Sequence, residues 1–431
     1  MKLQFNKLIF ILLTLSFSAR TPGQQVNWTH FRGNDLSGIS HAKSVPVKWN
    51  DSLNIKWRVR VEGRGWSSPV VYGNQIWLTS ATNDGKRMVA RCFDFNSGKE
   101  IFSKIIFEPV AVESIHDFNT YATPTPCIED GFVYLHFGTY GTACLRTSDG
   151  SVVWKRNDLN CKHVQGPASS PVLYKNLLIL HLEGTDVQFL VALDKRTGKT
   201  VWRTDRPSEL WNKLPEIGRK AYLTPLIINI AGKDLLISNG SAACIAYEPE
   251  TGKEVWRVTG GEDSTIAMAV AENGIVFFYS SFFTPPGGEQ YCDLVAVDPS
   301  GHGDVTLSKV KWRSKSPVLQ LLSPLIKDGV IYTIDSRNNL EYIDASTGKL
   351  ILTKKLAKKY QSSPVSAGGQ IYFTSTDGET LVVSEGRVLT VTSINKIRGK
   401  VFATPAILDE SVLIRTDNEL IKIGPSSKQV D

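Results

Sequence analysis

The residues of this chain best suited to acid–base chemistry are two histidines and two carboxylates: His116, His163, Glu183 and Asp186. The imidazole of histidine titrates near neutral pH, and the pKa of a carboxyl group rises where its surroundings disfavour the charged form. A histidine and a carboxylate held close together can therefore act as the base and the acid of a hydrolytic reaction. The four residues are far apart in the sequence, so this chemistry depends on a fold that brings them together.

A second group of side chains offers the contacts that a polar ligand needs. Aromatic rings can stack on a sugar or a peptide, amides exchange hydrogen bonds, and arginines hold carboxylate or sulfate groups. We predict ligand contacts for Arg64, Trp66, Asn119, Tyr121, Tyr140, Gln165, Arg219, Tyr222, Arg337, Gln361 and Arg398. No short spacing of histidine, cysteine or carboxylate residues indicates a metal site, and we find neither a nucleophile elbow nor a phosphate-binding loop.

The elements that must position these residues follow from the stretch 190–204, LVALDKRTGKTVWRT. An apolar run meets the turn from Asp194 to Gly198, and a β-rich run ending in Trp202 follows. The carboxylate of aspartate caps backbone N–H groups in such a turn, and glycine adopts a positive φ at little cost. The stretch therefore predicts a β-hairpin.

The same unit recurs along the chain. Further copies of the turn lie at residues 94–98, 148–150, 248–252, 298–301, 344–348 and, in a degraded form, 384–386. Ser-Pro or Thr-Pro pairs open an apolar strand before each hairpin, at Pro69, Pro126, Pro171, Pro225, Pro324, Pro364 and Pro405, with Ala269 in the remaining position. The mean period is about 48 residues, and such a period with about four short strands per unit predicts an eight-bladed β-propeller.

The pattern small-x-Asp-x-x-Thr-Gly-x-x-x-Trp, complete from Ala192 to Trp202, resembles the repeat of the PQQ-like eight-bladed propellers. The resemblance covers about residues 55–423 and implies an all-β fold of four-stranded blades. Members of this family include quinoprotein alcohol dehydrogenases, the B lipoprotein of the outer-membrane β-barrel assembly machine and exported proteins of unassigned role. Because the repeated residues are those that build the blades, the resemblance indicates the fold much more strongly than the function.

Resemblance to the quinoprotein dehydrogenases also implies an adjacent Cys-Cys pair, a calcium site built from Glu, Asn and Asp, and a considerably longer chain. The sequence has no Cys-Cys pair, and we can assign no such carboxylate set. We therefore expect neither bound PQQ nor any other cofactor.

The two ends of the repeat region complement each other. Residues 55–61 form a predicted strand with Trp57 at the repeat position, yet no strands of its own unit precede it. The last unit has only three predicted strands, at 404–408, 411–415 and 419–423. We therefore expect the N-terminal strand to be the outer strand of the last blade, which closes the ring and removes exposed strand edges.

The first residues of the chain have the features of a signal peptide. Lys2 and Lys7 accompany the apolar run 8–17, which is too short to span a bilayer, and no cysteine lies nearby to carry a lipid anchor. We predict a periplasmic or secreted protein with a cleaved signal peptide, no membrane span and no lipid anchor.

On this interpretation the chain has four segments. They are a signal peptide at 1–20, a lead-in at 21–54, the propeller at 55–424 and a C-terminal tail at 425–431. We expect Trp28, Phe31 and Arg32 to hold the lead-in on the propeller surface.

Tryptophans and cysteines occupy regular positions in the repeat. Trp154, Trp202, Trp256 and Trp312 recur once per blade at one register, which favours packing between neighbouring blades over a role in cofactor binding. The positions of the six cysteines favour buried thiols, and a disulfide between Cys127 and Cys161 is the alternative.

In a propeller, the loops that enter the innermost strands and those that join the second and third strands share one face. The longest such loops are predicted at 105–120, 205–220 and 282–290, so we expect the site at this mouth of the channel.

Two functions remain open at this stage. The first is an exported scaffold, expected to be monomeric, that binds a polymer, sugar or protein at the mouth. The second is a periplasmic or secreted carbohydrate-active enzyme that uses the histidines and carboxylates there. The formal charge of +7 comes without a basic run containing aromatic residues, so we expect no nucleic-acid partner.

Overall fold

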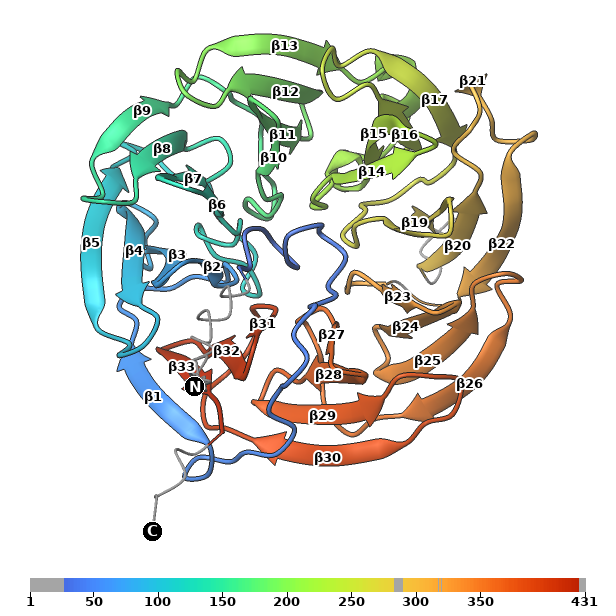
Figure 1. The fold of residues 1–431 in the computed structure, drawn as a ribbon. Coiled ribbons are helices and arrows are strands. Elements are labelled where there is room, and N and C mark those ends of the chain that lie inside the picture. Colours follow the sequence, from blue (N-terminus) through green and yellow to red (C-terminus); the bar gives the residue numbers. More distant parts are fainter. Residues whose placement is uncertain (1–26, 283–289, 317, 319, 426–431) are drawn as a thin grey trace, which may run out of the picture.

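Eight small sheets surround a central channel in the computed structural model, which describes residues 27–282, 290–316, 318 and 320–425 (Figure 1). Each sheet is one blade, and in each blade sequential strands run antiparallel from the channel outward. The fold is therefore the all-β, eight-bladed propeller that the repeat predicts. The predicted signal peptide at 1–20 lies outside the described residues.

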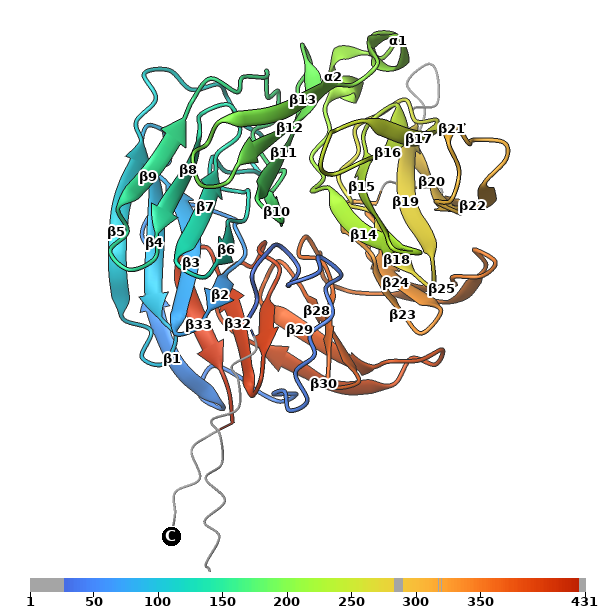
Figure 2. The same ribbon diagram turned by 45° about the horizontal axis from the view of Figure 1, so that its top comes forward.

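Blades 1 to 4 follow one another along the chain. They comprise β2–β5 (Val70–Tyr72, Gln75–Ala81, Met88–Asp94, Glu100–Phe107), β6–β9 (Cys127–Glu129, Phe132–His136, Thr142–Arg146, Val152–Arg156), β10–β13 (Val172–Tyr174, Leu177–Glu183, Gln188–Asp194, Thr200–Asp205) and β14–β17 (Leu226–Ile230, Lys233–Asn239, Ala243–Tyr247, Glu254–Thr259). The short strand β21 (Gly303–Asp304) adds to blade 4, parallel to β17. Two short helices, α1 (Ser208–Trp211) and α2 (Glu216–Arg219), lie in the loop between blades 3 and 4 (Figure 2).

Blades 5 to 8 complete the ring. They comprise β18–β20 with β22 (Val270–Glu272, Ile275–Phe282, Tyr291–Val297, Val310–Ser316), β23–β26 (Leu325–Lys327, Val330–Ile334, Asn339–Asp344, Leu350–Lys355), β27–β30 (Val365–Ala367, Gln370–Thr374, Glu379–Ser384, Val391–Lys396) and β31–β33 (Ala406–Leu408, Ser411–Arg415, Glu419–Ile423) with β1 (Ile55–Arg60). In blade 8, β1 pairs antiparallel with β33, with Val59 opposite Leu420. The predicted closure of the last blade by the N-terminal strand is thus confirmed.

The repeated aspartate turn closes its own hairpin and contacts a tryptophan of the preceding blade. In the turn that follows β12, Asp194 Oδ1 accepts the backbone N–H groups of Arg196 and Thr197, and Gly198 has a φ of 71°. The ring of Trp154, from blade 2, packs on this turn and donates its indole N–H to the carbonyl of Lys195 over 2.9 Å.

The same contact recurs around the ring. Indole N–H groups donate to the next blade's turn from Trp57 to Phe95, from Trp202 to Pro249 and from Trp312 to Ala345. Trp256 is fully buried beside β21 without a hydrogen-bond partner among the described residues. The repeated tryptophans therefore join blade to blade, as their register predicts.

The Ser-Pro and Thr-Pro pairs form a ring of their own around the channel. The residue before each proline donates its backbone N–H to the hydroxyl of the equivalent residue in the next blade. Such bonds, of 2.9–3.1 Å, join Ser68 to Thr125, Thr125 to Ser170, Ser170 to Thr224, Met268 to Ser323, Ser323 to Ser363 and Ser363 to Thr404. Met268 has no hydroxyl, so it donates to the next blade but accepts nothing from Thr224.

The lead-in lies across the channel rather than along the rim. Its residues from 27 onward, blue in Figure 1, run past the innermost strands and out to β1. Trp28 forms an antiparallel bridge with Val71, and Ile39 a parallel one with Ser366. Arg32, fully buried, donates to the carbonyl of Pro324 over 2.7 Å. These bonds fix the lead-in to blades 1, 6 and 7.

All six cysteines are buried and unbonded to one another. Cys127 and Cys161 belong to the same apolar cluster of blades 2 and 3, but they form no disulfide. The prediction of buried thiols is confirmed, and the alternative disulfide is not formed.

Candidate functional site

A cavity of about 360 Å³ lies at the centre of the ring, on the face where the long loops gather. We call it the cup. Its wall has two layers, and each blade contributes to the upper one. The upper layer consists of Trp66, Thr123, Ala168, Tyr222, Ile266, Leu321, Gln361 and Phe402. Each of these residues stands three positions before its blade's proline or, in blade 5, before Ala269.

The upper layer is asymmetric. Large side chains fill it on the side of blades 4, 5 and 6 and again at blades 8 and 1, where the rings of Trp66 and Phe402 stack at 4.2 Å. At blades 2 and 3 the corresponding residues are the small Thr123 and Ala168. The upper layer therefore has its smallest side chains at blades 2 and 3.

The lower layer is the ring of hydroxyls. The cup is lined by Ser68, Thr125, Ser170, Thr224, Ser323, Ser363 and Thr404. Six of these hydroxyl oxygens accept a backbone N–H from the preceding blade, and no described residue accepts their protons. The seventh, Ser68 Oγ, is buried without any described partner. The lower layer therefore presents a ring of hydrogen-bond donors.

Phe31 of the lead-in also lines the cup. Because the lead-in bonds to the innermost strands of blades 1 and 7, this segment crosses the channel below the hydroxyl layer. The cup is thus open at the mouth and has a floor.

The 108–120 loop forms the rim of the cup beside blades 1 and 2, and Glu113 anchors it. The backbone of Glu113 accepts the hydroxyl proton of Tyr121 over 2.7 Å and donates to the hydroxyl oxygen of Tyr140 over 3.0 Å. Its carboxylate accepts the backbone N–H of His163 over 2.9 Å. Arg64 adds a bond to the carbonyl of Asp117 and lies over the ring of Trp66.

This anchoring brings two predicted site residues of the loop into the cup. Asn119 donates to the carbonyls of Gln165 and Pro167 over 2.7 and 3.2 Å. His116 Nδ1 accepts the backbone N–H of Phe118, so the neutral ring carries its proton on Nε2. His116, Phe118 and Asn119 all line the cup.

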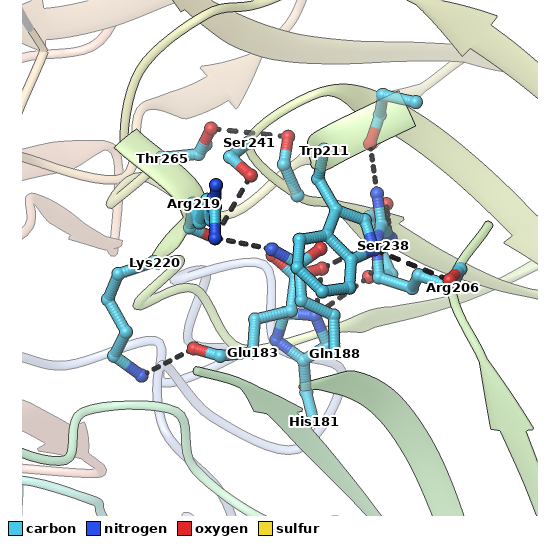
Figure 3. Close-up of polar contacts among 12 residues, drawn as sticks. His181, Glu183, Gln188, Arg206, Trp211, Arg219, Lys220, Ser238, Ser241 and Thr265 are labelled. Carbon is cyan, nitrogen blue, oxygen red and sulfur yellow. Dashed lines mark hydrogen bonds and ion pairs between the residues drawn. The ribbon is translucent and has the colours of Figure 1, made fainter. Parts of the chain in front are cut away.

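The 206–220 loop forms the rim beside blades 3 and 4, and Arg219 holds it (Figure 3). The guanidinium of Arg219 donates to the carbonyls of Leu214 and Asn212 within its own loop. Gln188 donates to the carbonyl of Arg219 over 2.6 Å. At the end of the loop, Tyr222 lines the cup and donates its hydroxyl proton to Gln165 Oε1.

Glu183 lies behind this loop in a buried ion pair (Figure 3). Its Oε1 is 2.7 Å from Arg206 Nε and 2.9 Å from His181 Nε2, and its side chain is fully buried. Burial opposes ionisation, but the attraction of Arg206 and His181 prevails and lowers the pKa of Glu183 to about 2. Arg206 also donates to Ser238 and Ala243, so the pair joins blades 3 and 4.

His163 and Asp186 also bond to backbone groups and so stabilise the fold. His163 Nε2 accepts the backbone N–H of Thr139 over 3.1 Å, and burial lowers the pKa of this imidazole well below its usual value, with the positive charge of Lys220 adding to the effect. Asp186 caps the backbone N–H groups of Lys162 and Val187. Of the four residues predicted for acid–base chemistry, His116 alone lines the cup.

The two remaining arginines lie away from the cup. Arg398 forms an ion pair of 3.1 Å with Glu419 beside the closure of blade 8. Arg337 lies in the turn after β24, where its N–H donates to Asp335 and its carbonyl accepts from Lys355.

The structure thus gathers six of the fifteen predicted site residues around one cavity: Trp66, His116, Asn119, Gln165, Tyr222 and Gln361. Arg64, Tyr121, Tyr140 and Arg219 hold the surrounding loops instead. Sequence reasoning missed Thr123, Ala168, Ile266, Leu321 and the hydroxyl layer. The signal for them was present, because these residues stand three positions and one position before the repeated proline.

The composition of the cup bears on cofactors. None of the described residues that line it is Asp, Glu, Lys or Arg. PQQ carries three carboxylates, and a site for it needs cationic partners that this lining lacks. The residues present therefore do not fit PQQ. Within the described part of the chain, no group of three or more His, Cys, Asp or Glu residues is placed to hold a metal ion.

The sequence comparison identifies the class of protein. Residues 54–209, 186–298 and 293–389 match the family described as outer membrane protein assembly factor BamB. The matches cover more than half of the chain, so the protein belongs to this family of PQQ-like propellers.

The individual relatives include an assembly factor and a dehydrogenase. The chain is 24% identical over 258 residues to the outer membrane protein assembly factor BamB of Moranella endobia (strain PCIT), covering 59% of this chain and 60% of that protein. It is 26% identical over 222 residues to the quinohemoprotein alcohol dehydrogenase ADH-IIG of Pseudomonas putida, covering 46% of this chain and 29% of that one. In both cases the match spans less than two thirds of the relative.

The solved structures agree on the fold. The crystal structure of BamB from Moraxella catarrhalis superposes with a TM-score of 0.60 at 12% identity, covering 88% of this chain and 99% of that chain. At this identity the likeness concerns the fold alone.

None of the helices in the described residues is long and apolar enough to cross a membrane.

Proposed function

We propose that this protein is an exported, non-catalytic propeller that binds a partner molecule through the cup. The observation that carries the proposal is the cup itself, a cavity with a layer of hydrogen-bond donors from seven of the eight blades and an aromatic rim. Cavities of a few hundred Å³ with apolar walls and a few placed polar groups are typical of ligand sites.

The lining favours binding over acid–base catalysis. Among its described residues His116 is the one histidine, and no Asp or Glu belongs to the lining to complete an acid–base pair. The polar groups of Glu183, His163 and Asp186 make contacts within the fold.

Export is the second part of the proposal. The charged and apolar residues at the start of the chain support it, as do the relatives named as outer membrane protein assembly factors. A partner that is a polymer, sugar or protein of the cell envelope or exterior fits both parts.

The test fills the cup. Ala168→Trp places an indole in the cup, and Val201→Trp places one on the outer strand β13 of the same blade, where Val201 is 53% exposed. Wild type and both variants are compared on glycan and peptide arrays, with thermal melts to verify folding. We expect Ala168→Trp to weaken binding of the partner at least about tenfold, the loss of one well-placed contact surface, while Val201→Trp binds like wild type. A cup-filled variant that is folded and binds every partner like wild type would overturn the proposal.

A further inference from the structure

A second hollow, of about 590 Å³, adjoins the cup between the 108–120 and 206–220 loops. We call it the groove. It is lined by Glu113, Ser114, Lys162, His163, Val164, Glu216 and Ile217. Neighbouring residues of the sequence line the two hollows. Val164 of the groove is followed by Gln165 of the cup, and Ser114 of the groove lies two residues before His116 of the cup.

The walls of the groove are held in place. The carboxylate of Glu113 accepts the backbone N–H of His163, which also forms part of the lining. Across the groove, Glu216 Oε1 is 2.9 Å from Lys162 Nζ and accepts a further hydrogen bond from Thr185. Two carboxylates and one lysine leave the groove with a net negative charge.

The floor of the cup restricts what can enter it. The lead-in crosses the channel below the hydroxyl layer, with Phe31 facing the cavity. A polymer that enters from the mouth therefore meets the lead-in at the base of the cup, so that an end of the polymer fits there better than an internal stretch. The following units of the polymer then leave past Gln165 of the cup and Val164 of the groove, where the two hollows adjoin.

The chemistry of the cup indicates an uncharged end. The hydroxyl layer supplies donors, Ser68 Oγ is buried without a described partner, and the side chain of Gln361 makes no hydrogen bond to any described residue. A terminal sugar offers many oxygen acceptors and carries no charge, whereas a peptide terminus or an acidic sugar brings a charge for which the lining holds no counter-charge. The carboxylates of the groove can accept sugar hydroxyls and disfavour an acidic polymer.

We propose that the cup and groove together bind the end of a linear, uncharged polysaccharide. Its terminal unit lies in the cup and the next units lie in the groove between Glu113 and Glu216. This inference rests on the proposed function, because it names the ligand class of the same cup.

The test uses the full chain and calorimetric titration with defined probes. These are linear tetrasaccharides of β-1,4-linked glucose, mannose and xylose and of α-1,4-linked glucose, with tetragalacturonate as the acidic counterpart. We expect at least one neutral tetrasaccharide to bind and tetragalacturonate to bind at least about tenfold more weakly, the cost of an uncompensated charge. Binding of none of the neutral probes, or equal binding of the acidic one, would overturn the proposal.

The requirement for an end is tested with the matching long polymer. A site that takes only chain ends binds in proportion to the number of ends, so the long polymer should bind far less per unit mass than the tetrasaccharide. Equal binding per unit mass would show recognition of internal units and contradict the proposal.

Variants assign the two halves of the site. Gln361→Ala removes one amide from the cup and should weaken the tetrasaccharide about three- to tenfold, as the loss of one neutral hydrogen bond does. Val164→Trp narrows the groove and should weaken the tetrasaccharide but not the free monosaccharide of the same sugar, which is titrated alongside it, while Val201→Trp is the matched control. An unchanged affinity in Gln361→Ala and Val164→Trp would overturn the placement.

The outcomes separate the two proposals. Peptides that bind in a manner sensitive to Ala168→Trp, with no sugar binding, would sink the polysaccharide inference and leave the binding function standing. Insensitivity of every ligand to Ala168→Trp would remove both.

Discussion

Single residues in the repeated turns hold neighbouring blades together. At Gly198 the φ of 71° is unfavourable for other residues, and a Cβ there would lie 2.6 Å from the ring of Trp154. Glycine is therefore required for two reasons: the turn needs a positive φ, and the tryptophan that packs on the turn leaves no room for a side chain. At Gly131, by contrast, φ is 77° but nothing lies within 4 Å of the added Cβ.

This contrast yields a prediction. Gly131→Ala should cost about 1 kcal/mol of unfolding free energy from backbone strain alone. Gly198→Ala should cost about 3 kcal/mol, because the indole of Trp154 must also move away from its contact. Urea unfolding of the two variants measures the difference. Equal losses would mean that the tryptophan contact adds nothing at this turn.

Glu183 was predicted to take part in acid–base chemistry, but it stabilises the fold through a buried ion pair. Its pKa of about 2 lies below the usual 4.5, so the carboxylate is charged in the folded protein at neutral pH. The stabilisation from this shift is present above pH 4.5 and is lost as the pH falls toward 2. Its partner Arg206 is equally buried.

Replacing Glu183 by Gln should therefore destabilise the protein by about 3–5 kcal/mol, since the variant leaves the charge of Arg206 buried without a counter-charge. The matched control is Asp158→Asn at the surface pair of Arg156 and Asp158, where the carboxylate side chain is 62% exposed. That change should cost less than about 1 kcal/mol. Chemical denaturation at pH 7 compares them, and a small loss in Glu183→Gln would contradict a structural role for the pair.

At the scale of elements, the weakest connection in the ring is the pairing of β1 with β33. In every other blade the fourth strand comes after the third along the chain without crossing from the other end, whereas β1 and β33 come from opposite ends of the propeller. Partly buried Val59 of β1 packs on the core cluster of blade 8.

We predict that Val59→Pro destabilises the protein by about 3 kcal/mol or more, because proline disrupts the strand and with it the closure of the ring. Val201→Pro on the outer strand of blade 3 is the control. It damages one edge without opening the ring, and it should cost less. Thermal melts of both variants are the measurement, and a larger effect of Val201→Pro would refute the importance of the closure.

The strands were the part of the structure that the sequence predicted best. The strands at 411–415 and 419–423 and the closing strand from residue 55 follow from the repeat, since each depends on a local turn and an apolar run. The path of the lead-in does not follow, because WTHFRG has no periodicity and its position depends on contacts with distant strands such as the bond from Arg32 to Pro324.

The candidate site was predicted only in part for a related reason. Residues at a propeller mouth either face the cavity or hold the loops, and the sequence alone does not distinguish the two. Tyr121 and Tyr140 share the aromatic character of Tyr222, yet both hold the backbone of Glu113 whereas Tyr222 lines the cup. The number of positions between a residue and the repeated proline predicts which residues form the wall of the cup. It does not predict which residues of the loops face the cavity.

At the scale of the whole molecule, buried histidines make stability depend on pH. Burial lowers the pKa of His30 to about 4 and that of His136 to about 3, and it lowers the pKa of His163 well below 6.5. These three side chains come from the lead-in, blade 2 and the loop between blades 2 and 3. They remain neutral in the folded protein at a pH where they bind protons in the unfolded chain.

The sign of the effect follows directly. Since the unfolded chain binds more protons below pH 6.5, the unfolding free energy must fall as the pH falls through that value. Each histidine contributes about 1 kcal/mol between pH 6.5 and 5.5, so the three together predict a loss of about 3 kcal/mol. Urea unfolding at pH 7.5, 6.5 and 5.5 measures it, and a constant free energy below pH 6.5 would contradict the buried, neutral state of these rings.

A pair of variants assigns the effect to a residue. His136→Asn should destabilise the protein at every pH but reduce the loss between pH 6.5 and 5.5 by about 1 kcal/mol, because one titrating ring is gone. Thr142→Val removes the 2.8 Å hydrogen bond between Thr142 and the ring while keeping the imidazole buried. This control should lower stability and retain the full pH-dependent loss. If both variants kept the full loss, the proton uptake on unfolding would arise from groups other than His136.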